Sequence, residues 1–117
     1  MSTLSTVLAA GLGVVFLAAG AAKLAGNERV VANFKRWGYA DVVRTTTGAV
    51  EMLAAACLLV GIAVNAVAIT GALLVMFVMT GALMTHGRMK DPLAIWVAPV
   101  VLFAMAVALL VSMLPEG

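Results

Sequence analysis

Charged side chains are scarce in this sequence. The 117 residues include seven Lys or Arg and five Asp or Glu, together 10% of the chain, whereas 65% of the residues are hydrophobic. A typical soluble domain is about 25% charged, so this chain cannot cover a globular surface with solvated groups. The composition excludes an ordinary soluble domain and a disordered protein, and it predicts an integral membrane protein.

Cysteine and histidine are rarer still, with one residue of each. The lone Cys57 excludes an internal disulfide, and the lone His86 cannot supply the three or four ligands of a zinc site. The sequence also lacks a phosphate-binding loop, a dinucleotide fingerprint and a Ser-His-Asp arrangement. We therefore expect no metal site, and the cofactor stays unknown because the sequence supports none. The few basic residues adjoin apolar segments and do not indicate nucleic-acid binding.

Charge is absent from three long stretches, residues 1–22, 52–87 and 92–115. The middle stretch is too long for one span of about 20 residues and slightly short for two, so a span must begin upstream and carry Glu51 into the membrane. A turn at 61–65 separates these two spans, and the absence of period-two alternation favours helices over a β-barrel. We expect one all-α domain over 1–117, with four transmembrane helices at about 4–25, 42–64, 66–86 and 93–114.

The segment between the first two spans has a different pattern. Val30, Phe34 and Trp37 recur at helical spacing, and charged or polar residues occupy another face. Asn27 is suited to cap such a helix. We expect a short amphipathic helix at about 28–37 that lies in the membrane interface. The alternative is a structured loop that covers the ends of the spans.

All seven basic residues flank the first and third connections between the expected spans. With four spans these two connections lie on the same side of the bilayer, and the positive-inside rule assigns that side to the cytoplasm. We therefore expect a multi-pass protein of the plasma membrane with both termini outside the cytoplasm. Its obligatory partner is the lipid bilayer, and the sequence leaves a homo-oligomer open.

Glu51 is the polar residue that most needs an explanation. At 1.5 Å per residue it lies roughly 10–14 Å below the membrane surface, where a carboxylate costs several kcal/mol unless it is neutralised or paired. Helical spacing places Arg44, Thr47 and Glu51 on one face of the second span, and we expect this face to point into the bundle. Glu51 then either binds a ligand or a proton, or belongs to a hydrogen-bonded clamp between helices.

Lys23, near the end of the first span, is the candidate partner of Glu51. Its face also carries Gly20, which allows close helix approach, although an isolated lysine could extend to the headgroups instead. His86 ends the third span and either exchanges protons with Glu51 or is a polar helix end. No catalytic residue is assigned, and Glu51 and His86 are the only candidates. The candidate pocket residues are Lys23, Arg44, Thr47, Glu51, Thr80 and His86.

Several motifs resemble those of DoxX-like membrane proteins. Residues 16–24 are similar to the family's small-Gly-x-x-Lys-Leu motif, which closes its first helix, and residues 48–53 to its Gly-x-x-Glu-x-Leu motif in the second helix. Three further segments resemble the family's third helix and the connection that follows it: residues 80–82, 85–86 and 91–92. The resemblance implies a four-helix bundle with an interhelical pocket bordered by Lys23, Glu51 and His86.

Three functions are compatible with these observations. The first is an accessory protein that binds a small lipophilic molecule or a partner membrane subunit, which explains the small size and the lack of catalytic motifs. The second is a proton-coupled transporter of small molecules that uses Glu51. The third is a redox subunit or an isomerase with Glu51 and His86 as acid and base. The resemblance associates the family with membrane redox processes, but an oxidoreductase activity would rest on analogy alone. We favour the first.

Overall fold

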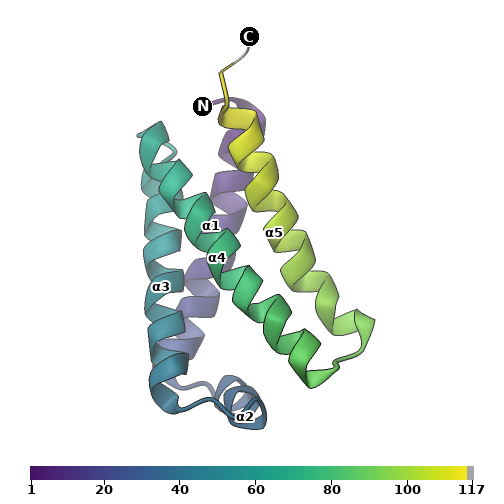
Figure 1. Ribbon diagram of the computed structural model, residues 1–117. Coiled ribbons are helices and arrows are strands. Elements are labelled where there is room, and N and C mark those ends of the chain that lie inside the picture. The colour runs from purple at the N-terminus through teal and green to yellow at the C-terminus, as the bar shows by residue number, and fades with distance from the viewer. Residues whose placement is uncertain (116–117) are drawn as a thin grey trace.

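The computed structural model describes residues 1–115, and within them the chain forms five α-helices and no strand (Figure 1). Four of the helices are long and apolar enough to cross a membrane, and α2 is the short one. The predicted all-α class is therefore confirmed. The helices are α1 Thr3–Ala25, α2 Glu28–Arg36, α3 Asp41–Val60, α4 Asn65–Met89 and α5 Leu93–Met113.

The helix ends follow from local backbone chemistry. Helices α1 and α5 lie within one residue of the spans expected at 4–25 and 93–114. Helix α3 ends at Val60 and not at 64, because the backbone from Gly61 onward turns, with the Val64 N–H donating to the Val60 carbonyl at 3.1 Å. Helix α4 continues past 86 to Met89 and ends where Lys90 adopts a left-handed conformation with φ 54°.

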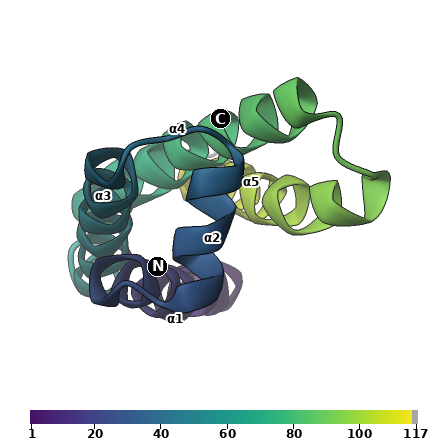
Figure 2. The same ribbon diagram turned by 90° about the horizontal axis from the view of Figure 1, so that it is seen from below.

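Helix α2 begins at the expected cap. The Asn27 side-chain oxygen accepts the backbone N–H groups of Arg29 at 3.0 Å and Val30 at 3.3 Å, which satisfies two donors that a helix start leaves free. Phe34 is its one buried residue. Helix α2 lies across one end of the bundle, and this end faces the viewer in Figure 2.

Helices α1 and α3 pack side by side because two glycines face each other. A Cβ added at Gly20 would lie 2.9 Å from the carbonyl oxygen of Gly48, and one added at Gly48 would lie 2.9 Å from Cβ of Lys23. Neither position has room for a larger residue without a shift of backbone. This close approach brings the end of α1 that carries Lys23 against α3.

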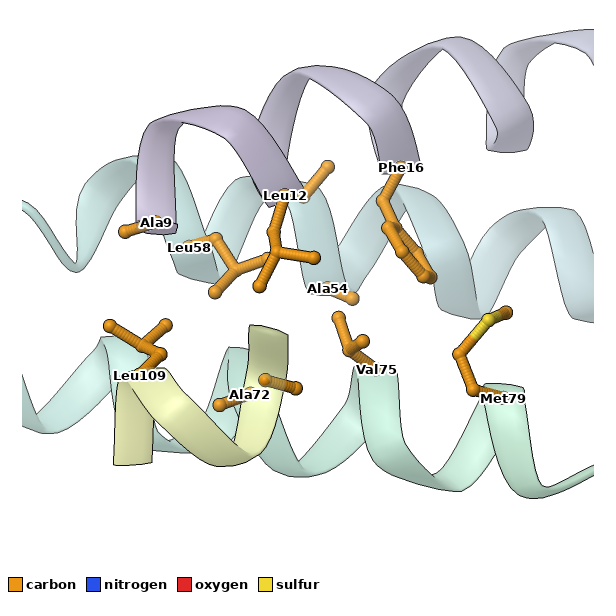
Figure 3. Close-up of a cluster of buried hydrophobic side chains, with 11 residues drawn as sticks. Ala9, Leu12, Phe16, Ala54, Leu58, Ala72, Val75, Met79 and Leu109 are labelled. Carbon is orange, nitrogen blue, oxygen red and sulfur yellow. The ribbon is translucent and has the colours of Figure 1, made fainter. Parts of the chain in front are cut away.

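The apolar core occupies the half of the bundle nearest the termini. Leu12, Phe16, Leu58, Val75 and Leu109 are buried there and bring four helices into contact (Figure 3). Toward the end that carries α2, α4 and α5 diverge from α1 and α3 (Figures 1 and 2). The site described below lies in this diverging half.

Candidate functional site

Two cavities occupy the region in which α4 diverges from α1 and α3. The first cavity, of about 470 Å³, lies between α3 and α4 and is bounded at one end by Phe34, Trp37 and Tyr39. The second cavity, of about 200 Å³, lies between α1, α4 and α5. The two adjoin, because the same four residues line both of them: Lys23, Glu51, Met79 and Ala82.

Lys23 and Glu51 form an ion pair where the two cavities adjoin. Nζ of Lys23 lies 2.7 Å from Oε1 of Glu51, and the side chains are 18% and 2% exposed. Of the two alternatives that the sequence left open for Lys23, the structure shows the contact with Glu51. Glu51 is ten residues from the start of α3, so it lies about 15 Å along that helix. At that depth a carboxylate needs a partner, and the lysine provides it.

The threonines expected at the pocket line the first cavity. Thr47 and Thr80 both contribute to its wall, and their hydroxyls donate to the carbonyl oxygens of Val43 and Met76, each at 2.7 Å. A threonine hydroxyl used in this way still offers lone pairs to a hydrogen-bond donor. These two residues therefore add weakly polar points to a wall that is otherwise apolar.

Arg44 lines neither cavity. Its guanidinium donates to the carbonyl oxygen of Lys23 at the end of α1 and lies 4.0 Å from the carboxylate of Asp41. A cation at a helix C-terminus satisfies free carbonyls and opposes the negative end of the helix dipole. Arg44 therefore connects α1 to α3 and does not face the space in which a ligand would lie.

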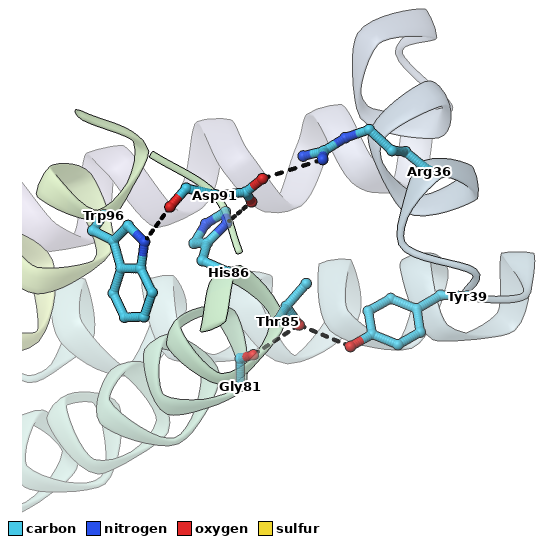
Figure 4. A network of polar contacts seen from close by, with 7 residues as sticks. All are labelled: Arg36, Tyr39, Gly81, Thr85, His86, Asp91 and Trp96. Atoms are coloured by element: carbon cyan, nitrogen blue, oxygen red, sulfur yellow. Dashed lines mark hydrogen bonds and ion pairs between the residues drawn. The ribbon is translucent and has the colours of Figure 1, made fainter. Parts of the chain in front are cut away.

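His86 lines the second cavity and is held by an aspartate from outside α4. Its Nδ1 lies 2.8 Å from Oδ2 of Asp91, and Arg36 of α2 donates to the other carboxylate oxygen at 3.2 Å (Figure 4). The hydrogen bonds from His86 and then from Arg36 hold the pKa of Asp91 below its usual range. The indole of Trp96 donates to the Asp91 backbone carbonyl at 3.0 Å. The imidazole is therefore fixed by one carboxylate.

Tyr39 attaches the segment after α2 to α4. Its hydroxyl lies 2.8 Å from Oγ1 of Thr85, which donates to the carbonyl of Gly81 at 2.9 Å (Figure 4). The guanidinium of Arg88 lies 5.1 Å from the centre of the Tyr39 ring and donates to the carbonyl of Trp37 at 2.6 Å. Hydrogen bonding with Thr85, and then with Arg88, lowers the pKa of Tyr39. These contacts position the aromatic end of the first cavity.

Sequence analysis did not identify Asp91, Arg36 and Tyr39 as parts of the site. Arg36 and Asp91 are 55 residues apart, and no local pattern connects them. One signal was present in the sequence, because Asp91 follows a helix that has a histidine in its last turn. A carboxylate at that position is within reach of such a histidine once the helix ends.

Among residues 1–115, no group of three or more His, Cys, Asp or Glu side chains is placed to hold a metal ion. The site offers one ammonium, one carboxylate and one imidazole between apolar walls. Such groups can bind the polar end of an apolar molecule, and they can accept or donate protons.

The fold and this site define the class of protein. Four helices able to cross a membrane, connected by short segments, make it a multi-pass membrane protein. The model of the DoxX-like family matches residues 7–109, and the chain therefore belongs to that family. No curated protein matches the chain, and no solved structure does.

Proposed function

We propose that this DoxX-like protein is a membrane accessory protein that binds a small lipophilic molecule in the first cavity. The supporting observation is the cavity itself, about 470 Å³ in volume, with apolar side chains around one buried ion pair. Pockets for small molecules generally enclose about 300–1,000 Å³, with mostly apolar walls and a few polar groups. The apolar body of the ligand lies against α4, and its polar end meets Lys23 and Glu51.

The ligand enters the cavity from the bilayer. Phe77 and Met84 line the first cavity, and they are 74% and 71% exposed on α4. Large apolar side chains with this exposure suit a helix face that contacts hydrocarbon. A lipophilic molecule that enters past these two side chains reaches the ion pair without crossing water.

The second part of the proposal concerns membrane placement. All seven basic residues belong to α2 or to the neighbouring helix ends, which supports a cytoplasmic position for that end of a plasma-membrane protein. Helix α2 then lies in the cytoplasmic interface, and both termini lie outside. We further propose that the ligand, or a partner subunit, takes part in a membrane redox process. This part rests on the resemblance to redox-associated relatives.

Ligand binding can be measured through Trp37, which lines the first cavity. The chain has two tryptophans, so Trp96→Phe leaves Trp37 as the only indole. We expect bromoundecanol to quench its fluorescence saturably in lipid nanodiscs, and excess undecanol to reverse the effect. Quenching that rises without saturation, as for a probe dissolved in the lipid, would contradict the proposal.

A pair of variants at Gly81 distinguishes a probe bound in the first cavity from a probe dissolved in the lipid. Gly81 lines the first cavity, and a Cβ added there meets no atom within 4 Å. Gly81→Leu fills the cavity, whereas Gly81→Ala makes the same backbone change and leaves most of the space open. In the Trp96→Phe background, we expect the leucine variant to lose saturable quenching and the alanine variant to keep it.

A further inference from the structure

The second cavity contains a group that the proposed function does not use. His86 lines it from α4, opposite apolar residues of α1 and α5 that include Phe16 and Leu102. The cavity also reaches Lys23 and Glu51, so three polar side chains face a space that is otherwise apolar. Their chemistry indicates what this space can bind.

Asp91 determines which nitrogen of His86 carries the proton. Its carboxylate stays ionised, because its pKa is lowered by His86 and Arg36, and an ionised carboxylate only accepts hydrogen bonds. Nδ1 lies 2.8 Å from this carboxylate, so Nδ1 must carry a hydrogen. In the neutral imidazole the other nitrogen, Nε2, then has a free lone pair. The cavity therefore presents a hydrogen-bond acceptor.

The surroundings keep the imidazole in this orientation. The rings of Trp37 and Trp96 lie against it, with centroids 6.0 and 6.4 Å from that of His86. Arg36 lies on the far side of the carboxylate. Of the charged groups on neighbouring elements, Lys23 and Glu51 share the cavity and are already paired with each other at 2.7 Å. Among residues 1–115 no protein donor is placed on Nε2, which makes it an acceptor at this cavity in addition to the carboxylate of Glu51.

We infer that the second cavity binds the hydroxyl group of a lipophilic alcohol, which donates a hydrogen bond to Nε2 of His86. Lys23 has two further N–H groups beyond its contact with Glu51, and one of them can donate to the alcohol oxygen. The alkyl chain lies between Phe16, Pro99 and Leu102. Asp91 acts as a positioning residue, because it selects the imidazole form that is protonated at Nδ1. In this form Nε2 can accept a hydrogen bond from the alcohol. This site adjoins the one proposed above and shares Lys23 with it, but His86 lines only the second cavity.

The form of the imidazole can be observed directly. His86 is the only histidine, so nitrogen-15 histidine labelling gives one pair of ring signals without assignment. For the neutral imidazole, we expect the spectrum of the form protonated at Nδ1. Asp91→Asn should shift it toward the form protonated at Nε2, because an amide can donate to Nδ1. Arg36→Gln, which removes the other partner of Asp91, should leave the spectrum unchanged.

Two matched probes test the ligand class. n-Octanol and heptyl methyl ether have the same number of heavy atoms, but only the alcohol donates a hydrogen bond. We expect n-octanol to change the Nε2 signal saturably and to bind roughly five- to tenfold more tightly than the ether, as one added hydrogen bond implies. The preference should disappear in Asp91→Asn and persist in Arg36→Gln.

The outcomes distinguish this inference from the proposed function. A wild-type imidazole protonated at Nε2, or equal affinity for the two probes, would overturn the hydroxyl site while the Trp37 measurement still stands. If n-octanol leaves the His86 signals unchanged, the hydroxyl site is likewise overturned. Gly81→Leu fills only the first cavity, so it should not alter the response of His86.

Discussion

The ion pair of Lys23 and Glu51 shows how one residue depends on another inside a membrane bundle. Glu51 is almost completely buried, and Lys23 is its charged partner at 2.7 Å. A buried pair need not stabilise a fold relative to apolar residues, but loss of one partner leaves a charge without compensation. The two residues therefore depend on each other, and a ligand that contacts one of them depends on both.

Substitution of one member should be more harmful than substitution of both. Glu51→Gln leaves Lys23 unpaired, and we expect a loss of roughly 3–5 kcal/mol in unfolding free energy, seen as a lower Tm in detergent. The double variant Lys23→Met/Glu51→Leu should recover part of that loss. Glu28→Gln, at an exposed position of α2, is the control and should have little effect. Additive effects of single Lys23→Met and Glu51→Leu changes would show that the two residues do not interact.

At the scale of elements, the contact between α1 and α3 sets the position of the pair. Gly20 and Gly48 let the two backbones approach, and Lys23 and Glu51 each lie three residues beyond one of these glycines. One helical turn thus connects the point of closest approach to the charged residues. Helix α2 is positioned differently. Arg36 contacts Asp91, just beyond α4, and the following residues Trp37 and Tyr39 contact the last turns of α4.

A methyl group at this helix contact should weaken the bundle. Gly20→Ala places Cβ 2.9 Å from the Gly48 carbonyl oxygen and 3.0 Å from the Met52 nitrogen. Because both are backbone atoms, overpacking should cost about 1–3 kcal/mol. Gly81→Ala is the matched control, since its Cβ meets open space and alanine favours a helix by about 1 kcal/mol. We expect thermal unfolding to show a lower Tm for the first variant only, and equal shifts would argue against a tight contact.

At the scale of the whole molecule, charge and cavities gather at one end. Helix α2 and the connection between α4 and α5 lie at the end opposite the two termini (Figure 1). The apolar core fills the half nearest the termini, so the diverging half has space for a ligand. The end that we assign to the cytoplasm is therefore also the end that holds the candidate site.

Topology can be tested with compartment-specific reporters. Because all seven basic residues lie at the α2 end, the positive-inside rule predicts an external C-terminus. A C-terminal alkaline phosphatase fusion should be active, and a C-terminal green fluorescent protein should be dark. The same reporters inserted after Gly38 should give the opposite pattern. A fluorescent C-terminal fusion would reverse the proposed orientation.

The sequence by itself determined the features that depend on neighbours along the chain. Long uncharged runs define the four long helices, because a bilayer span requires about 20 apolar residues. Asn27 defines the start of α2 through its side-chain cap. Helix spacing made Lys23 a candidate partner of Glu51, since each lies one turn from a glycine that permits close packing, but only the structure decided between this contact and a lysine that extends to the headgroups.

Only the tertiary structure decided where the helices separate and which distant groups meet. The two cavities exist because α4 packs on α3 near Gly71 and diverges below it. The crossing of α4 and α3 depends on side chains from several helices, so no periodic pattern in the sequence predicts it. The same holds for Asp91, which joins His86 to Arg36 across 55 residues. Local pattern specifies each helix, whereas the cavities and the orientation of His86 arise from packing between elements that are far apart in the chain.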